Sequence, residues 1–171
     1  MNLSKHLKER HFQAERYSVF LCEDVVIFPL WNLSGQMVGY QQYRPSANKE
    51  KRNHPRDCRY YTSVHGDKHS KPIAVWGVDT LHYRKDIVVI VEGIFDACRL
   101  HNHGIPCVAL LSSSYKPHKN WLTSLGRKVY KVEDDHGSGL GPYEGLKLPE
   151  GVADLGECTE DQVKDLVSQI K

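Results

Sequence analysis

Five consecutive β-branched apolar residues, IVVIV at 87–91, constrain the fold of this chain more than any other feature. Lys85 and Asp86 precede the run, and Glu92-Gly93 follows it directly. Residues of this kind favour strands, and a strand that is apolar on both faces is typical of the middle of a parallel sheet. The run therefore predicts a buried parallel strand that ends at a carboxylate.

The segment after this strand alternates between helix and strand patterns. Residues 94–104 predict a helix that ends at Gly104 in the left-handed conformation. Residues 106–112 predict a second buried strand, residues 116–127 a short helix, and residues 128–132 a third strand. This alternation is the element order of a parallel α/β sheet with right-handed crossovers.

A smaller lobe of mixed α+β structure is expected before this sheet. Residues 3–16 predict a short, weakly amphipathic helix. Residues 25–32 and 36–44 predict two strands, and Leu33-Ser34-Gly35 between them predicts a tight hairpin turn.

The rest of this lobe is expected to be mostly loop. Residues 45–72 contain three prolines and many charges, which indicates a long basic loop with one short strand near residues 59–62. Residues 74–81 then read as the last part of the lobe. We therefore expect two domains, at 1–84 and 85–171.

The composition excludes several classes of protein. Apolar residues make up 40% of the chain and charged residues 26%, which is typical of folded globular proteins rather than disordered ones. No apolar run approaches the roughly 18 residues of a membrane span, and the polar start lacks a signal-peptide core. The five cysteines form no CxxC pair, which argues against a disulfide framework and fits reduced thiols in a cytoplasm.

Histidine is frequent, with ten residues, yet no pair has the spacing of a helix-borne zinc site. We therefore expect these side chains to be surface residues rather than ligands. The expectation covers His54, His65, His69, His101, His103 and His118.

Carboxylates follow two of the predicted strands. Glu92 closes the first strand, and Glu133 and Asp135 close the third. Binding sites in parallel sheets gather at the carboxyl ends of the strands, so these side chains are expected at one edge. Hard oxygen ligands suit Mg²⁺ or Mn²⁺, which would support phosphoryl or nucleotidyl transfer. The sequence thus predicts a metal site made of Glu92, Glu133 and Asp135.

Glu92 and Asp96 are the candidate catalytic residues. Gly93, directly after Glu92, would let the backbone pass close to a ligand. Asp96 falls in the first turn of the predicted helix, where it either belongs to the site or complements the helix dipole. Glu92 acts either as a metal ligand or as a general base, and both roles stay open.

Positive charge gathers in the first lobe, although the formal net charge is only +2. Residues 44–72 hold eight Lys or Arg against three Asp or Glu, which either attracts phosphate or forms a solvated loop. Tyrosines interleave with these charges, and they either stack on unpaired bases or pack between strands. The candidates for nucleic-acid or nucleotide binding are Arg44, Lys51, Arg52, Arg56, Arg59 and Tyr61.

The chain resembles the Toprim family, and within it the catalytic core of bacterial and phage DnaG-type DNA primases. VVIVEGIFDACRLHNHGIPCVALLS, residues 88–112, resembles the first Toprim motif, Glu-Gly-x-x-Asp, and VYKVEDDHGSG resembles the second, Asp-x-Asp after a strand. VVIFPLWNLSGQMVGYQQYRP, WGVDTL and LPEGVADLGECTEDQVKDLV resemble primase segments in the same order. Together these stretches cover nearly the whole chain.

This resemblance implies a Toprim-like parallel sheet flanked by helices, with a primase-like basic lobe before it. The implied activity is metal-dependent synthesis of short RNA primers on single-stranded DNA, with Mg²⁺ or Mn²⁺ as cofactor. The implied partners are the DNA template and ribonucleoside triphosphates, together with a replicative helicase or a separate zinc-binding module. The implied location is the cytoplasm, or the host cytoplasm for a phage protein.

Two departures from the family keep other functions open. Glu133 stands where the family has Asp, and residues 137–147 are rich in Gly where the family has a helix. The alternatives are a small Toprim nuclease that acts on RNA or DNA, and a Toprim-shaped nucleic-acid-binding protein whose carboxylates no longer catalyse.

The last primase-like segment predicts a further acidic contribution. Thr159 reads as the N-cap of a closing helix, with Gln162 at the capping-box position. Glu157 or Asp161 would then face the metal edge, or else form a solvated helix start.

Overall fold

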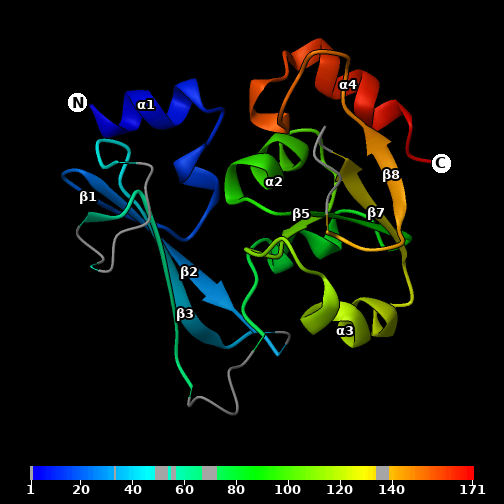
Figure 1. Ribbon diagram of the computed structural model, residues 1–171, viewed down its shortest axis with the longest axis horizontal. Helices are drawn as coiled ribbons and strands as arrows, with labels where there is room; N and C mark the ends of the chain where they lie inside the picture. Colours follow the sequence, from blue (N-terminus) through cyan, green and yellow to red (C-terminus); the bar gives the residue numbers. More distant parts are fainter. Residues whose placement is uncertain (1, 33, 49–53, 55–56, 67–72, 134–138) are drawn as a thin grey trace. The chain divides into compact units, whose positions relative to one another are not determined.

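The structure is a computed structural model, shown in Figure 1. It describes residues 2–32, 34–48, 54, 57–66, 73–133 and 139–171. The chain forms two compact units, one up to Ala74 and one from Val75 onward. Four predicted site residues lie outside the described residues, namely Lys51, Arg52, Arg56 and Asp135.

The first unit contains a four-stranded antiparallel sheet whose spatial order follows the chain. Its strands are β1 (Phe20–Cys22), β2 (Val25–Trp31), β3 (Met37–Tyr43) and β4 (Tyr60–Val64). β2 and β3 confirm the predicted hairpin. Its turn is stabilised by the side chain of Asn32, whose Oδ1 accepts hydrogen bonds from the N–H groups of Ser34 and Gln36, each at 2.9 Å.

The helix predicted over 3–16 is shorter than expected. α1 spans Leu3–Glu9, and a separate 3-10 turn, η1, spans Ala14–Arg16. The chain between them passes through His11, whose φ of 57° is incompatible with a continuing right-handed helix. Phe12 is buried and packs edge-on against Phe28 of β2 at 5.4 Å, which attaches this segment to the sheet.

The second unit contains a parallel sheet with the spatial order β6-β5-β7-β8. The strands are β5 (Ile87–Val91), β6 (Cys107–Ala109), β7 (Lys128–Glu133) and β8 (Glu144–Lys147). Every residue of β5 is buried, as its composition predicts for a central strand whose two faces are both covered. The mixed α/β fold class predicted from the sequence is therefore confirmed.

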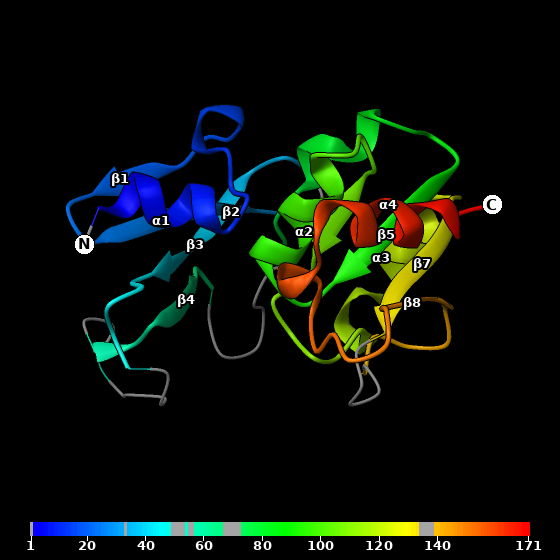
Figure 2. The same ribbon diagram turned by 90° about the horizontal axis from the view of Figure 1, so that it is seen from above.

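Helices cover both faces of this parallel sheet. α2 (Ile94–His101) and α4 (Glu160–Ser168) lie on one side, and α3 (Lys119–Ser124) lies on the other (Figures 1 and 2). Two 3-10 turns, η3 (Val78–His82) and η4 (Lys116–His118), precede β5 and α3. Among the described residues, no helix combines the length and apolar character that a membrane span requires.

The sequence does not predict β8. A parallel crossover usually needs a dozen or more residues and a helix, yet only residues 134–143 separate β7 from β8. Glycine packing takes the place of a helix in the described part of this crossover. A Cβ atom at Gly139 would lie 2.2 Å from the carbonyl oxygen of Ser113, and one at Gly141 would lie 2.8 Å from the ring of Tyr115.

The compact units divide ten residues earlier than the predicted domain boundary after residue 84. Trp76 forms an antiparallel bridge with Ala109, and its ring stacks on that of His101 at 5.4 Å. These contacts place the start of the segment 75–84 in the second unit. The identification of the first domain as a primase-like basic lobe and of the second as a Toprim domain remains a proposal.

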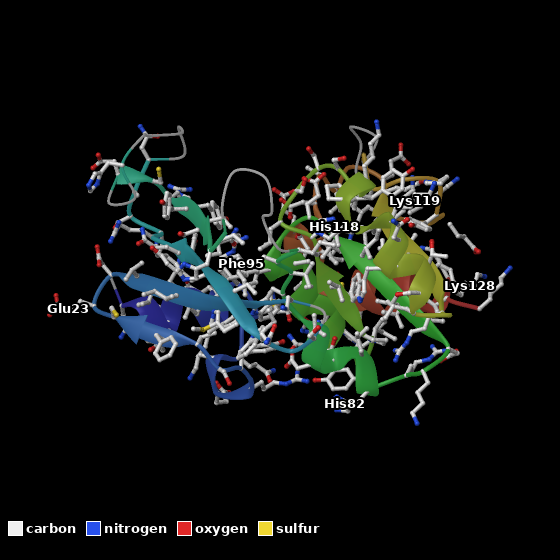
Figure 3. The ribbon with its side chains drawn as sticks, turned by 90° about the horizontal axis from the view of Figure 1, so that it is seen from below. Glu23, His82, Phe95, His118, Lys119 and Lys128 are labelled. Carbon is white, nitrogen blue, oxygen red and sulfur yellow. The ribbon has the colours of Figure 1, made fainter. Side chains whose placement is uncertain are left out.

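The expectation of surface histidines is wrong for two of the described residues, and His69 lies outside the described residues. His101 has no exposed surface, and its Nε2 hydrogen bonds to the carbonyl oxygen of Cys107 at 2.8 Å. His118, labelled in Figure 3 beside Lys119, is 5% exposed. Burial lowers the pKa of His118, and a hydrogen bond from its ring to the backbone of Ser114 opposes this effect only in part. The polar residues around these histidines in the sequence give no sign of their burial, because the burial depends on packing between distant segments.

Arg99 joins α2 to the closing helix. Its guanidinium is 1% exposed, and Nη1 lies 2.7 Å from Oε1 of Glu160, while Nη2 donates to the carbonyl of Cys158. The predicted capping box of α4 is confirmed, with the side chains of Thr159 and Gln162 each bonded to the other's backbone N–H. Arg99 therefore fixes the start of α4 against α2.

This ion pair predicts an asymmetric response to mutation. Glu160→Ala should lower the free energy of unfolding by about 2 kcal/mol, between the values for exposed and buried pairs, because it leaves a buried cation without its carboxylate. Adding Arg99→Met should recover part of this loss, since no buried charge remains. Urea unfolding measures both, with Asp161→Ala as an exposed control that should change little. A double variant less stable than Glu160→Ala would contradict the interpretation.

Candidate active site at the carboxyl edge of the parallel sheet

The topology of the second unit predicts where a site should lie. The connection from β5 leads through α2 to β6 on one side, whereas the connection from β7 leads to β8 on the other. In open parallel sheets, ligands bind at such a switch point, outside the carboxyl ends of the two strands. β5 and β7 are neighbours in parallel register, with Ile90 opposite Lys131. The crevice should therefore lie beyond Val91 and Val132.

The structure has a cavity of about 200 Å³ at this position. Three carboxylates from three different segments line it, among apolar walls. The lining residues are Val91, Glu92, Asp96, Val132, Leu140, Leu148, Asp154 and Leu155. Apolar walls strengthen the electrostatic interactions of a ligand with carboxylates, because they lower the local dielectric constant.

Glu92 and Asp96, the two predicted catalytic residues, both line this cavity. Glu92 directly follows β5, and its carbonyl oxygen accepts a hydrogen bond from the N–H of Leu111 at 3.0 Å. Asp96 lies in the first turn of α2. A Cβ atom at Gly93 would lie only 2.8 Å from Oδ2 of Asp96. The glycine therefore leaves space for the carboxylate of this chain itself, a close approach that the sequence predicted for a ligand.

Asp154 is the cavity carboxylate that the sequence analysis missed. It is the N-cap of η5 (Leu155–Glu157), and its Oδ1 accepts a hydrogen bond from the N–H of Glu157 at 3.1 Å. The carboxylate of Glu157 accepts a separate hydrogen bond from the N–H of Ala153 at 3.4 Å. An acceptor followed three residues later by Glu is a capping-box pattern, so the sequence did contain a signal for this turn.

Glu157 and Asp161, the residues that we expected to supply this acidic contribution, do not line the cavity. The carboxylate of Glu157 accepts a hydrogen bond from the N–H of Ala153, just before η5. Asp161 is exposed and pairs with Lys164 at 2.9 Å. Of the two readings that the sequence left open, the solvated helix start describes Asp161.

Glu133 lies apart from this cavity. Val132 lines the cavity, and successive side chains of a strand point to opposite faces of the sheet, so Glu133 points to the other face. Its Oε1 is 3.5 Å from Nζ of Lys131, and its carboxylate lies against the backbone of Gly145. Glu133 is therefore not among the residues that line the cavity with Glu92.

The donor chemistry of the cavity fits a hard divalent cation. Carboxylate oxygens are its polar donors, and Mg²⁺ commonly binds one or two carboxylates while waters and phosphate oxygens complete its shell. Within the described ranges, no group of three or more His, Cys, Asp or Glu side chains is placed to hold one metal ion. A cation here would therefore depend on a phosphate-bearing ligand or on residues outside those ranges.

The thiols near Asp96 are unsuited to nucleophilic chemistry. Burial raises the pKa of Cys107 well above its ordinary value, and the charge of Asp96 adds to this effect. Burial likewise raises the pKa of Cys158. Both thiols are therefore poorer nucleophiles near neutral pH than an exposed cysteine.

The first unit brings together two of the predicted phosphate-binding residues. The N–H of Arg44, after β3, donates to the carbonyl of Arg59, before β4, at 2.8 Å. The side chain of Arg44 pairs with Asp24 at 3.1 Å, and Nε of Arg59 donates to the carbonyl of Ala47 at 2.9 Å. Both guanidinium groups are thus held in place.

Tyr61, the predicted aromatic contact, is half-buried in β4. Its ring lies 6.4 Å from that of Tyr40, with the planes tilted by 50°. Tyr60 points to the opposite face and is 46% exposed. Exposure therefore favours Tyr60 over Tyr61 as a surface for stacking.

No protein-family model matches the chain, and no curated protein matches it by sequence. Solved structures do match. The Aquifex aeolicus primase, comprising zinc-binding and RNA polymerase domains, has a TM-score of 0.64 and 22% identity, over 98% of this chain and 48% of that one. The Escherichia coli primase catalytic core has a TM-score of 0.61 and 15% identity, over 97% and 59%.

A third match is a DnaG primase catalytic domain bound to single-stranded DNA, with a TM-score of 0.60 and 16% identity, over 96% of this chain and 60% of that one. This chain thus spans about half to three fifths of the length of the three structures. Both sheets, the helices and their order are part of the matched region, which covers nearly all of this chain. The chain has the fold of a DnaG-type primase catalytic core.

Proposed function

We propose that this chain is a primase core, a nucleotidyltransferase that joins ribonucleotides on a single-stranded DNA template. The observation that carries the proposal is the cavity at the switch point between β5 and β7, which Glu92 and Asp96 share in a fold common to primase cores. Asp154 is the third carboxylate of this cavity. The setting would be the cytoplasm, or the host cytoplasm if the protein comes from a phage.

Each cavity residue has a distinct role in this proposal. A divalent cation, Mg²⁺ or Mn²⁺, would neutralise charge on the triphosphate as the new bond forms. Asp96 and Asp154 would hold it, with Asp135 as a further ligand proposed from the sequence. Glu92, which is exposed at the end of β5, would either join them or take the proton from the attacking hydroxyl.

Glu133 has a smaller part in the proposed centre than the sequence suggested. To reach the cavity, it would have to leave Lys131 and cross to the other face of β7. This position favours a second candidate function, a nucleic-acid-binding protein with a weakened catalytic centre. A nuclease would use the same carboxylates, and scoring primer synthesis separately from strand cleavage distinguishes the three functions.

The first unit would bind the template and the incoming nucleotide. Arg44 and Arg59 lie next to each other and are held rigidly, so that their planar groups could contact phosphates. A structural neighbour was solved with single-stranded DNA, which supports this kind of partner. Template unwinding or selection would come from a replicative helicase or a separate zinc-binding module.

Glu92→Gln should reduce primer synthesis by about 100-fold or more, because it removes a charge or a base from the centre but keeps the side-chain shape. A gel assay on single-stranded DNA with magnesium or manganese measures the product. The melting temperature should remain that of the wild type. Glu144→Gln, which changes an exposed carboxylate paired with Lys128, is the matched control and should keep full activity. Unchanged synthesis by Glu92→Gln would remove Glu92 from the centre.

Metal binding can be measured by thermal melting, independently of primer synthesis. Millimolar Mn²⁺ should raise the melting temperature of the wild type, since a ligand that binds the native state stabilises it. Asp96→Asn and Asp154→Asn should each reduce this rise. Asn is also a good N-cap, so Asp154→Asn preserves the cap of η5. Asp161→Asn is the control, and a rise that both cavity variants retain in full would contradict the proposed ligands.

Template binding should be electrostatic and depend steeply on salt. On single strands, the log–log slope of affinity against salt is roughly −0.7 per neutralised phosphate. Arg44→Ala with Arg59→Ala should make this slope shallower, whereas Mn²⁺ stabilisation should persist. Asp24→Asn, which frees Arg44 from its carboxylate, should strengthen binding instead. Fluorescence anisotropy with a short oligonucleotide measures the affinity of the wild type and both variants, and a melting curve measures the Mn²⁺ stabilisation. A wild-type salt slope in the double variant would exclude this surface as the template-binding site.

A further inference from the structure

Two tyrosine rings form a stack at the edge of the antiparallel sheet. Tyr43 of β3 is directly opposite Tyr60 of β4, and their ring centroids are 4.9 Å apart with planes 29° from parallel. Tyr43 is 2% exposed, whereas Tyr60 is 46% exposed. The inner ring is therefore part of the core, and the outer ring is open to solvent. β4 is the last strand of its sheet, so no further strand among the described residues covers it (Figure 2).

The stack is fixed at the hydroxyl ends of both rings. Nη1 of Arg10 donates to the hydroxyl oxygen of Tyr60 at 3.0 Å and to that of Tyr43 at 3.4 Å. The hydroxyl of Tyr43 also hydrogen bonds to Nε2 of His6 at 2.8 Å. The orientation of Tyr60 is thus set by a ring on one side and a cation at its edge. A ligand that stacks on it would lose little affinity to ordering the side chain, because the ring is already ordered.

A positive charge lies at the edge of this ring. Burial opposes the charged form of Arg10, but the two tyrosines outweigh this effect and raise its pKa above the ordinary value. Arg10 therefore stays charged at any pH of interest. Arg44 follows Tyr43 in the chain and Arg59 precedes Tyr60, so both arginines lie near the tyrosine pair, although their side chains bind Asp24 and the carbonyl of Ala47. An exposed aromatic face with a cation at its edge is a combination that unpaired bases recognise.

We propose that Tyr60 is a stacking platform for one unpaired base of a single-stranded nucleic acid, with Arg10 setting its plane. The inference deepens the proposed template binding and rests on it. It assigns the base contact to Tyr60 rather than to the half-buried Tyr61, and it leaves phosphate contacts to Arg44 and Arg59. If Tyr60 were merely structural, it would hold α1 to the sheet through Arg10. Its ring would then not affect the difference in affinity between strands with bases and strands without them.

The test compares two probes with the same phosphates. One is a twelve-nucleotide oligo-dT, and the other is its abasic equivalent, both labelled for anisotropy at moderate salt. The wild type should bind oligo-dT at least about fivefold more tightly, since stacking on one aromatic side chain contributes this much or more. Tyr60→Leu, which keeps apolar bulk but has no ring, should lose this preference and bind the abasic strand as the wild type does.

Two further variants separate stacking from packing. Tyr60→Phe keeps the ring but loses the hydrogen bond to Arg10, so it should retain most of the preference for bases. Phe20→Leu changes a ring on β1 that is 62% exposed, and it should retain the whole preference. Melting temperatures identify any variant that fails to fold, and Tyr60→Phe is the variant expected to keep the wild-type fold in every case.

The outcomes distinguish this inference from the proposed function. A wild type that binds both probes equally would overturn the stacking platform and leave phosphate-based template binding intact. A wild type that binds neither probe would overturn both. A preference for oligo-dT that Tyr60→Leu retains, or that Phe20→Leu loses, would assign the stacking to another ring. Loss in Tyr60→Leu alone, with the preference retained in Tyr60→Phe, would establish it.

Discussion

The burial of β5 between β6 and β7 is the constraint on which the second unit depends. All five of its residues are buried, and each β-branched side chain that leaves water stabilises the fold by about 1.5–3 kcal/mol. A charge inside this strand would forfeit that gain and add a desolvation cost, so the first carboxylate stands directly after it, at Glu92. Because the neighbouring strands run parallel to β5, their ends meet at the same edge, and this edge carries the cavity.

The cavity is completed by a segment far from β5 in the sequence. Asp154 belongs to the turn η5, which is followed at once by the start of α4, and Arg99 of α2 binds that start through Glu160 and Cys158. α2 itself begins beside Glu92 and carries Asp96 in its first turn. One short helix therefore carries one carboxylate of the cavity and anchors the segment that supplies another. A buried arginine in this helix costs desolvation, and its ion pair offsets that cost only if α4 stays docked.

Patterns with a short range in the sequence predicted most of the fold. The β2–β3 hairpin, the buried strand β5, the left-handed Gly104 and the capping box of Thr159 all follow from neighbouring residues, and each is confirmed. Features that depend on contacts between distant segments were harder to predict. The compact units divide at Ala74 because Trp76 pairs with Ala109. The sequence contained no signal for β8, whose described approach packs Gly139 and Gly141 against Ser113 and Tyr115.

The sequence alone determined that Glu92 and Asp96 lie together, because only three residues of strand end and helix start separate them and local geometry decides their distance. It could not decide between Glu133 and Asp154. The face of β7 that carries Glu133 depends on how the alternating side chains of the strand are placed in the sheet. The position of Asp154 depends on how α4 docks against α2. The tertiary structure places Val132 and Asp154 at the cavity, and in the same way it exposes Tyr60 while burying Tyr43.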